Sequence, residues 1–337
     1  MAATFSRKKP TFDLARLDAN GFDRLYEERI APAFAAAEPA RLAAVAHYNK
    51  CLILTIAAAI AASVAAGFFT DKYIVTIVGV MIGVALGYGV GMSKLKELSV
   101  KVKVATLEAI AKATDVKYSL NVPMDYAIHG ANAVGLVPEG DRTTCEDLFQ
   151  GYCRDWPYEL FDAHIEARSG DKYKTVFRGQ VVRIKFPRKC EGLTLVLHDA
   201  GAFNSFSDEE EYSFGGKPMK RVRLEDPKFE KAFQVYGTDQ VESRYLVHPV
   251  FMERLAAMEK TFAGEKLRCA FAYGELFVII EGRDRFELGA DLFKPLSAER
   301  ARGIVADLAS VVSLVDAVIS AQTLDRSLIP PKVQATA

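Results

Sequence analysis

The chain has 337 residues, half of them hydrophobic, and its 43 lysines and arginines equal its 43 aspartates and glutamates. A net charge of zero argues against a nucleic-acid-binding protein, which carries a basic excess. The length predicts about two domains. The cysteines are scattered and lack the C-x-x-C spacing of zinc or redox motifs, which favours a reducing compartment: Cys51, Cys145, Cys153, Cys190 and Cys269.

Residues 1–50 begin as a polar stretch and continue as an alanine-rich helical segment punctuated by Pro32 and Pro39. Two uncharged runs follow, at 51–69 and 73–92. A helix needs about 20 apolar residues, at ~1.5 Å rise each, to cross a hydrocarbon core of ~30 Å. The two runs therefore predict a transmembrane hairpin.

The second run has a glycine at every fourth position: Gly79, Gly83, Gly87 and Gly91. Neither G-x-x-x-x-G-K-[ST] nor G-x-G-x-x-G occurs, which excludes both glycine-rich phosphate loops. Such a stripe, a glycine zipper, lets another helix approach closely. Alanines share this spacing in the first run, at 57, 61 and 65 and at Ala58, Ala62 and Ala66. We expect the stripe to pack on that alanine face; the alternative is that it joins two protomers of a homo-oligomer.

Charges around the runs predict the topology. Lysines gather after the second run, at 94–103, whereas the tip carries only Lys72 beside Asp71. Basic residues mark the cytoplasmic side, so both termini are expected in the cytoplasm and the hairpin in the inner membrane, with the basic cluster on anionic lipid. Neither run contains an aspartate, glutamate, lysine, arginine or histidine. This favours an anchor over a transporter or channel.

The second membrane helix is expected to continue as a helical stalk over 93–114, ending near residue 113. Residues 115–296 then change character. Strand-like runs separated by short turns, with one helix at 248–262, predict an antiparallel α+β domain in the cytoplasm. Pro249 suits the first position of that helix, and Asp226 and Asp239 can each cap a short helical turn. The strand-like runs are 158–168, 175–186, 193–199, 220–226, 232–237, 269–282 and 285–289.

A last helix is predicted over 297–325, capped by Ser297 and followed by a tail at 326–337. Its apolar residues follow the 4-3-4-3 spacing of a coiled coil. Further apolar residues widen this stripe, so the helix either docks on its own domain or self-associates. The seam residues are Ile304, Leu308, Val311, Val315 and Val318.

Chemistry-bearing residues are sparse. Asp162, His164 and Glu166 alternate along one strand and share a face, which would suit a metal site. The favoured interpretation is that Phe161 and its alternate neighbours face the core and that the polar set is solvated. G-x-S-x-G and H-E-x-x-H are both missing. No cofactor and no catalytic residue is therefore predicted.

The stretch from Val222 to Leu255 resembles the bacterial domain-of-unknown-function family 3137, whose members are membrane-anchored and without an assigned activity. The resemblance includes Phe177-Arg178-Gly179, "LTLVLHD" at 193–199, "CEDLFQG" at 145–151, expected as an acidic turn before the first strand, and "LFKPL" at 292–296. It covers roughly residues 90–300 and implies no catalytic residues.

Two functions are compatible with these patterns. The preferred one is a membrane-anchored, non-catalytic scaffold, sensor or interaction protein of the bacterial inner membrane, with the lipid bilayer, further copies of itself or other membrane proteins as partners. The alternative is a membrane-tethered enzyme or small-ligand receptor whose site assembles only in the fold. A deep pocket lined by Asp162, His164 and Arg178 would favour the alternative.

Overall fold

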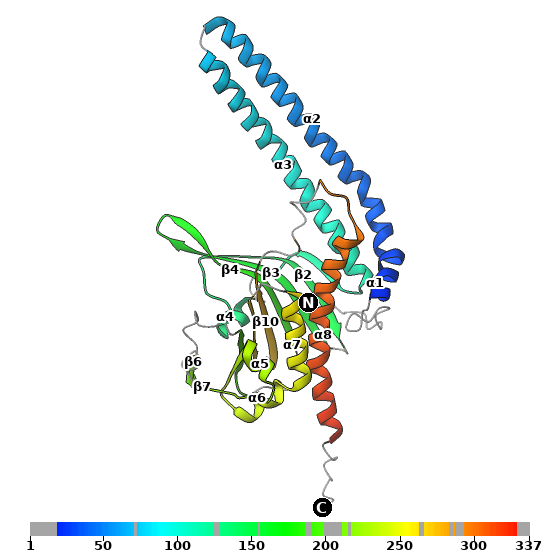
Figure 1. Cartoon of the computed structure of the whole chain (residues 1–337), viewed down its shortest axis with the longest axis vertical. Helices are drawn as coiled ribbons and strands as arrows, with labels where there is room; N and C mark the ends of the chain where they lie inside the picture. The colour runs from blue at the N-terminus through cyan, green and yellow to red at the C-terminus, as the bar shows by residue number, and fades with distance from the viewer. Residues whose placement is uncertain are drawn as a thin grey trace, which may run out of the picture. The chain divides into compact units, whose positions relative to one another are not determined.

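The structure is a computed structural model (Figure 1). It describes residues 19–70, 73–123, 128–153, 156–185, 191–198, 211–214, 217–262, 266–282, 286 and 293–328. The chain divides into two compact units, which we call the helical unit and the sheet unit. The helical unit comprises Arg24–Ile110 and Phe286–Ala301, and the sheet unit comprises Met1–Asp23, Ala111–Arg285 and Arg302–Ala337.

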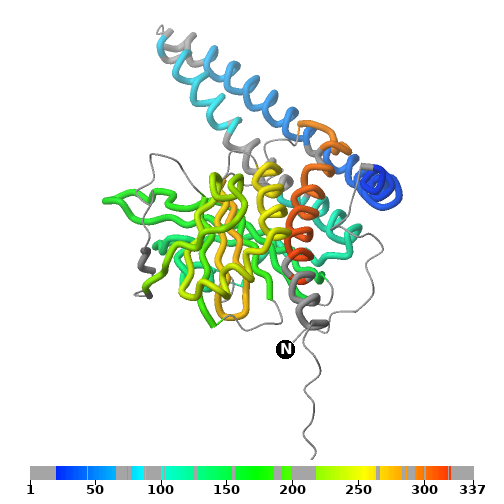
Figure 2. The backbone as a smooth tube through the Cα atoms, turned by 60° about the horizontal axis from the view of Figure 1, so that its bottom comes forward, coloured from blue at the N-terminus to red at the C-terminus, as the bar shows by residue number. Residues whose placement is uncertain are grey.

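Two long helices dominate the helical unit. After α1 (Ala19–Leu25) and a π-helical turn, η2 (Tyr26–Ile30), come α2 (Ala31–Thr70) and α3 (Tyr73–Ala113). They lie side by side and run in opposite directions in both views (Figures 1 and 2). The predicted membrane run 51–69 is the C-terminal half of α2, and the run 73–92 is the N-terminal half of α3. Helix α3 ends at Ala113, where the stalk was expected to end. Residues 71 and 72 lie outside the described part.

The sheet unit contains an antiparallel sheet, which confirms the predicted α+β class. Ten described strands are ordered β1-β2-β3-β4-β10-β9-β5-β8-β7-β6. Their bounds are β1 Lys117–Asn121, β2 Arg142–Cys153, β3 Trp156–Ser169, β4 Lys172–Lys185, β5 Thr194–His198, β6 Glu211–Phe214, β7 Lys217–Arg221, β8 Phe233–Gly237, β9 Lys266–Ala272 and β10 Glu275–Glu281.

Several strand predictions need correction. The "CEDLFQG" stretch is no turn before the first strand: it lies inside β2, and β1 precedes it. The run at 269–282 spans two strands, because Tyr273 and Gly274 both take positive φ, 55° and 75°, and close the β9–β10 turn. Of the run at 220–226, only the first two residues belong to β7.

A β-bulge in β2 changes which side chains face which side. Between the pairs Glu146–Asp162 and Phe149–Leu160, two residues of β2 oppose one of β3. Asp147 supplies the extra residue: its φ is 60°, it is fully buried, and its carboxylate accepts a 2.6 Å hydrogen bond from the Tyr118 hydroxyl. Because side chains alternate along a strand, the bulge reverses the alternation beyond it.

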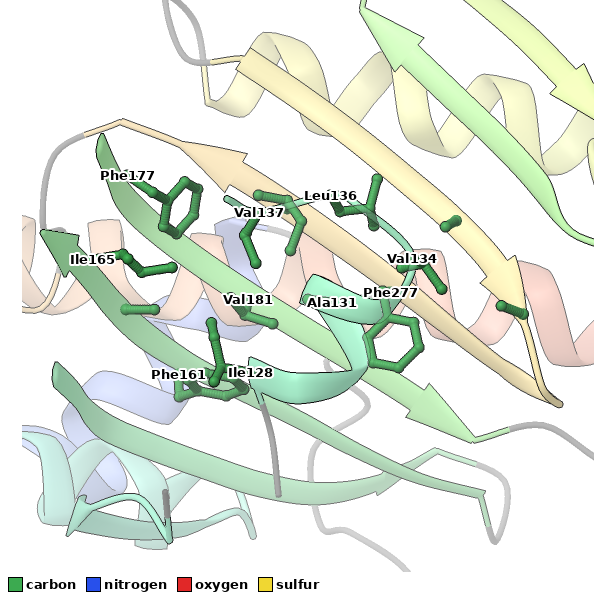
Figure 3. Close-up of a cluster of buried hydrophobic side chains, with 14 of the residues drawn as sticks. Ile128, Ala131, Val134, Leu136, Val137, Phe161, Ile165, Phe177, Val181 and Phe277 are labelled. Carbon is green, nitrogen blue, oxygen red and sulfur yellow. The ribbon is translucent and has the colours of Figure 1, made fainter. Parts of the chain in front are cut away.

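One face of the sheet is covered by α4 (Ile128–Ala133) and the segment after it (Figure 3). Gly130 lies against Phe277, so close that a Cβ would be 2.5 Å from the ring. The Arg268 guanidinium donates a 2.6 Å hydrogen bond to the Leu136 carbonyl and holds the segment down. The core on this side includes Phe161, Ile165, Phe177, Val181 and Ile279.

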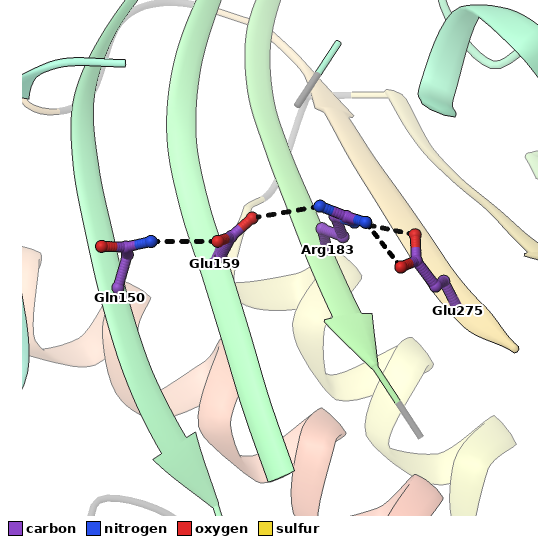
Figure 4. A network of polar contacts seen from close by, with 4 residues as sticks. All are labelled: Gln150, Glu159, Arg183 and Glu275. Atoms are coloured by element: carbon purple, nitrogen blue, oxygen red, sulfur yellow. Dashed lines mark hydrogen bonds and ion pairs between the residues drawn. The ribbon is translucent and has the colours of Figure 1, made fainter. Parts of the chain in front are cut away.

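The opposite face is covered by α7 (Pro249–Thr261) and α8 (Ala298–Leu328), which lie behind the sheet in Figure 4. The rings of Phe251 and Phe271 are 5.2 Å apart. The caps of α5 (Pro227–Ala232) and α6 (Gln240–Leu246) are Asp226 and Asp239, as predicted, and Pro249 opens α7.

Helix α8 is covered by its own chain. Ser310 and Asp316 contact Thr261 and Cys153 of the sheet unit. Four of the predicted seam residues, Ile304, Leu308, Val311 and Val315, are at most 4% exposed. The side chain of Val318 lies outside the described part. The stripe therefore docks within the chain, and these four residues are not available as a seam between two chains.

Candidate functional site

The most distinctive surface of the molecule is apolar and belongs to α2 and α3. Large side chains along both helices are exposed, among them Ile53 (65%), Leu54 (57%), Ile77 (56%), Met81 (67%) and Leu86 (63%). A folded soluble protein rarely exposes a continuous apolar surface of this kind. Within the described residues, one stretch, Asn20–Ala65, is long and apolar enough to cross a membrane, and the apolar stretch Ile77–Leu86 in α3 is shorter.

The glycine stripe of α3 faces α2. A Cβ placed on Gly83 would lie 1.8 Å from the Ala59 Cβ, and one on Gly79 would lie 2.5 Å from the Ser63 hydroxyl. Ser63 is buried, whereas Ala58 and Ala62 are exposed. The contact face of α2 is therefore rotated by one residue, about 100°, from the predicted alanine face. The side-chain positions of Gly87, Gly91 and Ala66 lie outside the described part.

Residues 293–296 lie beside α2 within the helical unit. The Phe293 and Tyr48 rings meet edge-to-face, with centroids 5.6 Å apart. At the other end, Glu38 binds Arg41 through hydrogen bonds of 2.6 and 2.9 Å. The hydrogen bond from Arg41, with a further one from the Leu296 backbone, lowers the pKa of the Glu38 carboxyl. The last four residues of the "LFKPL" motif thus lie against α2.

The three predicted polar residues, Asp162, His164 and Glu166, all lie on β3 but differ in their surroundings. Asp162 is buried, 6% exposed, and pairs across the sheet with Gln180. His164 contacts the Thr175 hydroxyl at 2.8 Å. A bulge between Ile165 and Glu166 shifts the register with β4 at that point. The expectation that Asp162 is solvated is wrong, because helices cover this face of the sheet too. No group of three metal-binding side chains occurs in the described residues.

A charged ladder on the α4 side of the sheet was not predicted (Figure 4). Arg183 binds Glu275 with both arms of its guanidinium, at 2.7 and 2.5 Å, and lies 3.6 Å from Glu159. The Gln150 amide donates a 3.0 Å hydrogen bond to Glu159. The ladder links β2, β3, β4 and β10, and its ionic side chains are only 11–17% exposed. Its charges satisfy one another, which suits a structural tie across four strands.

The sequence carried a signal for this ladder. Glu159 lies between Tyr158 and Leu160, and Arg183 lies between Val182 and Ile184, in strand-like runs. A charged side chain in a buried strand needs a partner, and the neighbouring strands supply it. Which strands are neighbours, however, depends on the sheet order.

Other reactive side chains are unactivated or paired. Burial raises the pKa of the Cys145 thiol to about 11 and raises that of Cys269 further. Neither thiol is a ready nucleophile, because the thiolate is the reactive form. His198, which the sequence places next to Asp199, instead contacts Glu259 of α7 at 2.8 Å. The described chemistry thus favours structural roles.

Comparison with known proteins gives a family match over part of the chain and no activity. Residues 175–319 match the family model described as Protein of unknown function (DUF3137). No match is found among the curated proteins. The crystal structure of the mycobacterial trehalose monomycolate transport factor A, TtfA, is similar at 10% identity and a TM-score of 0.32, covering 60% of this chain and 92% of that chain.

The family match includes the Phe177-Arg178-Gly179 strand, the "LTLVLHD" strand and the stretch from Val222 to Leu255 on which the resemblance was based. Residues 175–319 of this chain are therefore similar to the DUF3137 family of proteins of unknown function.

Proposed function

We propose that this protein is a membrane-anchored, non-catalytic scaffold or sensor of the bacterial inner membrane, with α2 and α3 crossing the bilayer as a hairpin. The observation that carries the proposal is the exposed apolar surface of both helices, described between Ile53 and Val64 and between Ile74 and Tyr88. It lies within two runs without a single charge, 51–69 and 73–92. Exposed to water, each fully solvated large apolar side chain costs about 1.5–3 kcal/mol relative to burial. Lipid removes that cost.

The dimensions suit a bilayer. Nineteen and twenty helical residues extend about 28 and 30 Å, close to the ~30 Å of the hydrocarbon core. Gly79 and Gly83 bring the helices together without large side chains between them, which is how helices pack in lipid. The lysines at 94–103 and the near-neutral tip favour cytoplasmic termini and a cytoplasmic sheet unit.

The sheet unit supports the non-catalytic part of the proposal. The ladder charges bind one another, His198 is engaged by Glu259, and burial holds the Cys145 thiol protonated. Partner binding by this unit, to other membrane proteins or to a second copy, fits these observations better than bond-making chemistry.

Fractionation tests the anchor. The wild-type chain should sediment with membranes and resist extraction by alkaline carbonate. Ile60→Asp combined with Ile82→Asp places two charges in the exposed apolar faces and should release much of the protein, because a central charge costs about 3 kcal/mol or more in a membrane helix. Val241→Asp, on the sheet unit at 79% exposure, is the matched control and should stay in the membrane.

Wild-type protein that stays in the aqueous fraction without detergent would overturn the anchor. Topology is tested separately. A reporter that is active only in the cytoplasm should be active at residue 337 and silent when inserted at the hairpin tip. The reverse pattern would overturn the proposed orientation.

A further inference from the structure

We infer that Phe293 and Lys294 form a third contact with the membrane, at the cytoplasmic interface beside α2. The inference rests on the proposed anchor and deepens it. It names a segment far from the hairpin in sequence, inside the family-matched region, as a lipid-facing element.

The first argument is depth. Tyr48 lies three residues before Cys51, where the uncharged run begins, which is about 4.5 Å along the helix axis. Phe293 packs on Tyr48 with centroids 5.6 Å apart. The Phe293 ring is therefore level with the edge of the proposed hydrocarbon core.

The second argument is direction. Leu296 reaches Glu38, whereas Phe293 reaches Tyr48, so the segment runs along α2 with Phe293 at the end nearer the membrane run. Ten helical residues span about 15 Å and three extended steps about 10 Å, so only a nearly extended strand can make both contacts. Pro295 favours this, because the residue before a proline avoids helical geometry.

The third argument is chemistry. Phe293 is 53% exposed although its ring already touches Tyr48, and Lys294 beside it is also exposed, as is Lys50 on α2. Aromatic rings with adjacent lysines are the side chains that settle at the boundary between acyl chains and headgroups. The exposed part of the ring would face acyl chains, and the lysines would face lipid phosphates.

Fluorescence quenching by brominated lipids tests this placement. Trp156 is the single tryptophan, so Trp156→Phe gives a silent background. In that background, Phe293→Trp is placed in the full-length chain, reconstituted in phosphatidylcholine–phosphatidylglycerol vesicles. We expect blue-shifted emission that is quenched more by bromine near the carbonyl end of the acyl chain than by bromine near its methyl end.

Two matched probes separate the inference from the anchor. Ile60→Trp, in the membrane run, should be quenched more by bromine near the methyl end. Tyr273→Trp, 73% exposed in the β9–β10 turn, should not be quenched. Quenching at position 60 without quenching at 293 overturns the inference and leaves the anchor standing, whereas no quenching at 60 overturns the anchor.

Equal quenching at 293 and 273 would mean that the whole sheet unit rests on the bilayer, and it would also overturn the specific contact. Lys294→Trp is a second probe in case Phe293→Trp disturbs packing on Tyr48. It should show the same preference for shallow bromine, and red-shifted, unquenched emission there contradicts the inference.

Discussion

Helix α8 and the α2–α3 pair present long apolar helical faces that end in opposite environments. Four residues of the α8 stripe are at most 4% exposed, whereas Ile53, Met81 and Leu86 are 63–67% exposed. The difference has a sequence correlate: α8 interleaves its stripe with Asp307 and Asp316, and the membrane runs contain no charge. A helix with one apolar stripe buries that stripe against other parts of the protein. A helix that is apolar on all sides needs an apolar environment all around it, such as lipid.

The largest expected effect tests the buried half of this comparison. Phe161→Ala removes a fully buried ring from the core under α4 and should destabilise the sheet unit by about 3–5 kcal/mol. Chemical denaturation followed by near-UV circular dichroism measures it. Ile60→Ala on the exposed face of α2 is the control and should leave this transition unchanged. An equal loss of stability in Ile60→Ala would contradict the contrast between the buried core and the exposed face of α2.

The next largest effect concerns the charged ladder of the sheet unit, whose buried charges depend on one another. Arg183→Met leaves Glu159 and Glu275 with little water and no guanidinium, and should cost about 2–3 kcal/mol. Adding Glu275→Gln to that variant removes one of the unpaired charges and should restore part of the loss. A double variant no more stable than Arg183→Met would show that the ladder does not act through charge pairing.

The hairpin is expected to respond to volume rather than to charge. Gly83→Ala forces a methyl group onto Ala59 and should cost about 1–2 kcal/mol of helix–helix packing. Ala59→Gly in the same chain makes room and should recover most of it. Thermal unfolding in mild detergent measures the stability of both variants. Ala85→Leu, on the exposed side of α3, is the control and should change the unfolding temperature little. If Ala59→Gly does not recover the stability that Gly83→Ala loses, then Gly83 does not pack against Ala59.

The smallest effect concerns pH and is confined to the sheet unit. Burial lowers the pKa of His248, whose ring nitrogen accepts the Phe251 amide at the start of α7. The folded state therefore favours the neutral ring. Its contribution is complete above the unfolded pKa, near 6.5, and is lost as pH falls through the lower folded value.

We expect His248→Asn, which can still cap the helix, to flatten this dependence between pH 7 and 5. Unfolding midpoints measured across that range give the result. A wild-type midpoint that rises as pH falls in this window would contradict the assigned direction.

The sequence predicted correctly those helix starts and ends that depend on residues within the same helical turn. Asp226 and Asp239 cap their helices, Pro249 opens α7, and α3 ends at Ala113, because each signal acts within one helical turn. The alanine face of α2 shows the limit. With alanine at 57, 58, 59, 61 and 62, several rotations of the helix offer small side chains, and only the partner helix selects Ala59 and Ser63.

Non-local features escaped prediction for a related reason. Asp162 was expected in water because its alternate neighbours are apolar, and nothing local reveals that helices cover the second face as well. The ladder requires β10 to lie beside β4, although about ninety residues separate Arg183 from Glu275. The split of 269–282 into two strands depends on Tyr273, a residue type that seldom adopts positive φ.

The bulge at Asp147 makes the length of β2 matter more than its composition. If the strand kept Asp147 but alternated without the bulge, Phe149 would turn toward the α4 side and Gln150 would point at the helices, away from Glu159. One residue inserted or lost beyond the bulge would likewise invert every later side chain of the strand at once. Relatives of this chain should therefore tolerate exchanges along β2 far more readily than a change in its residue count beyond Asp147.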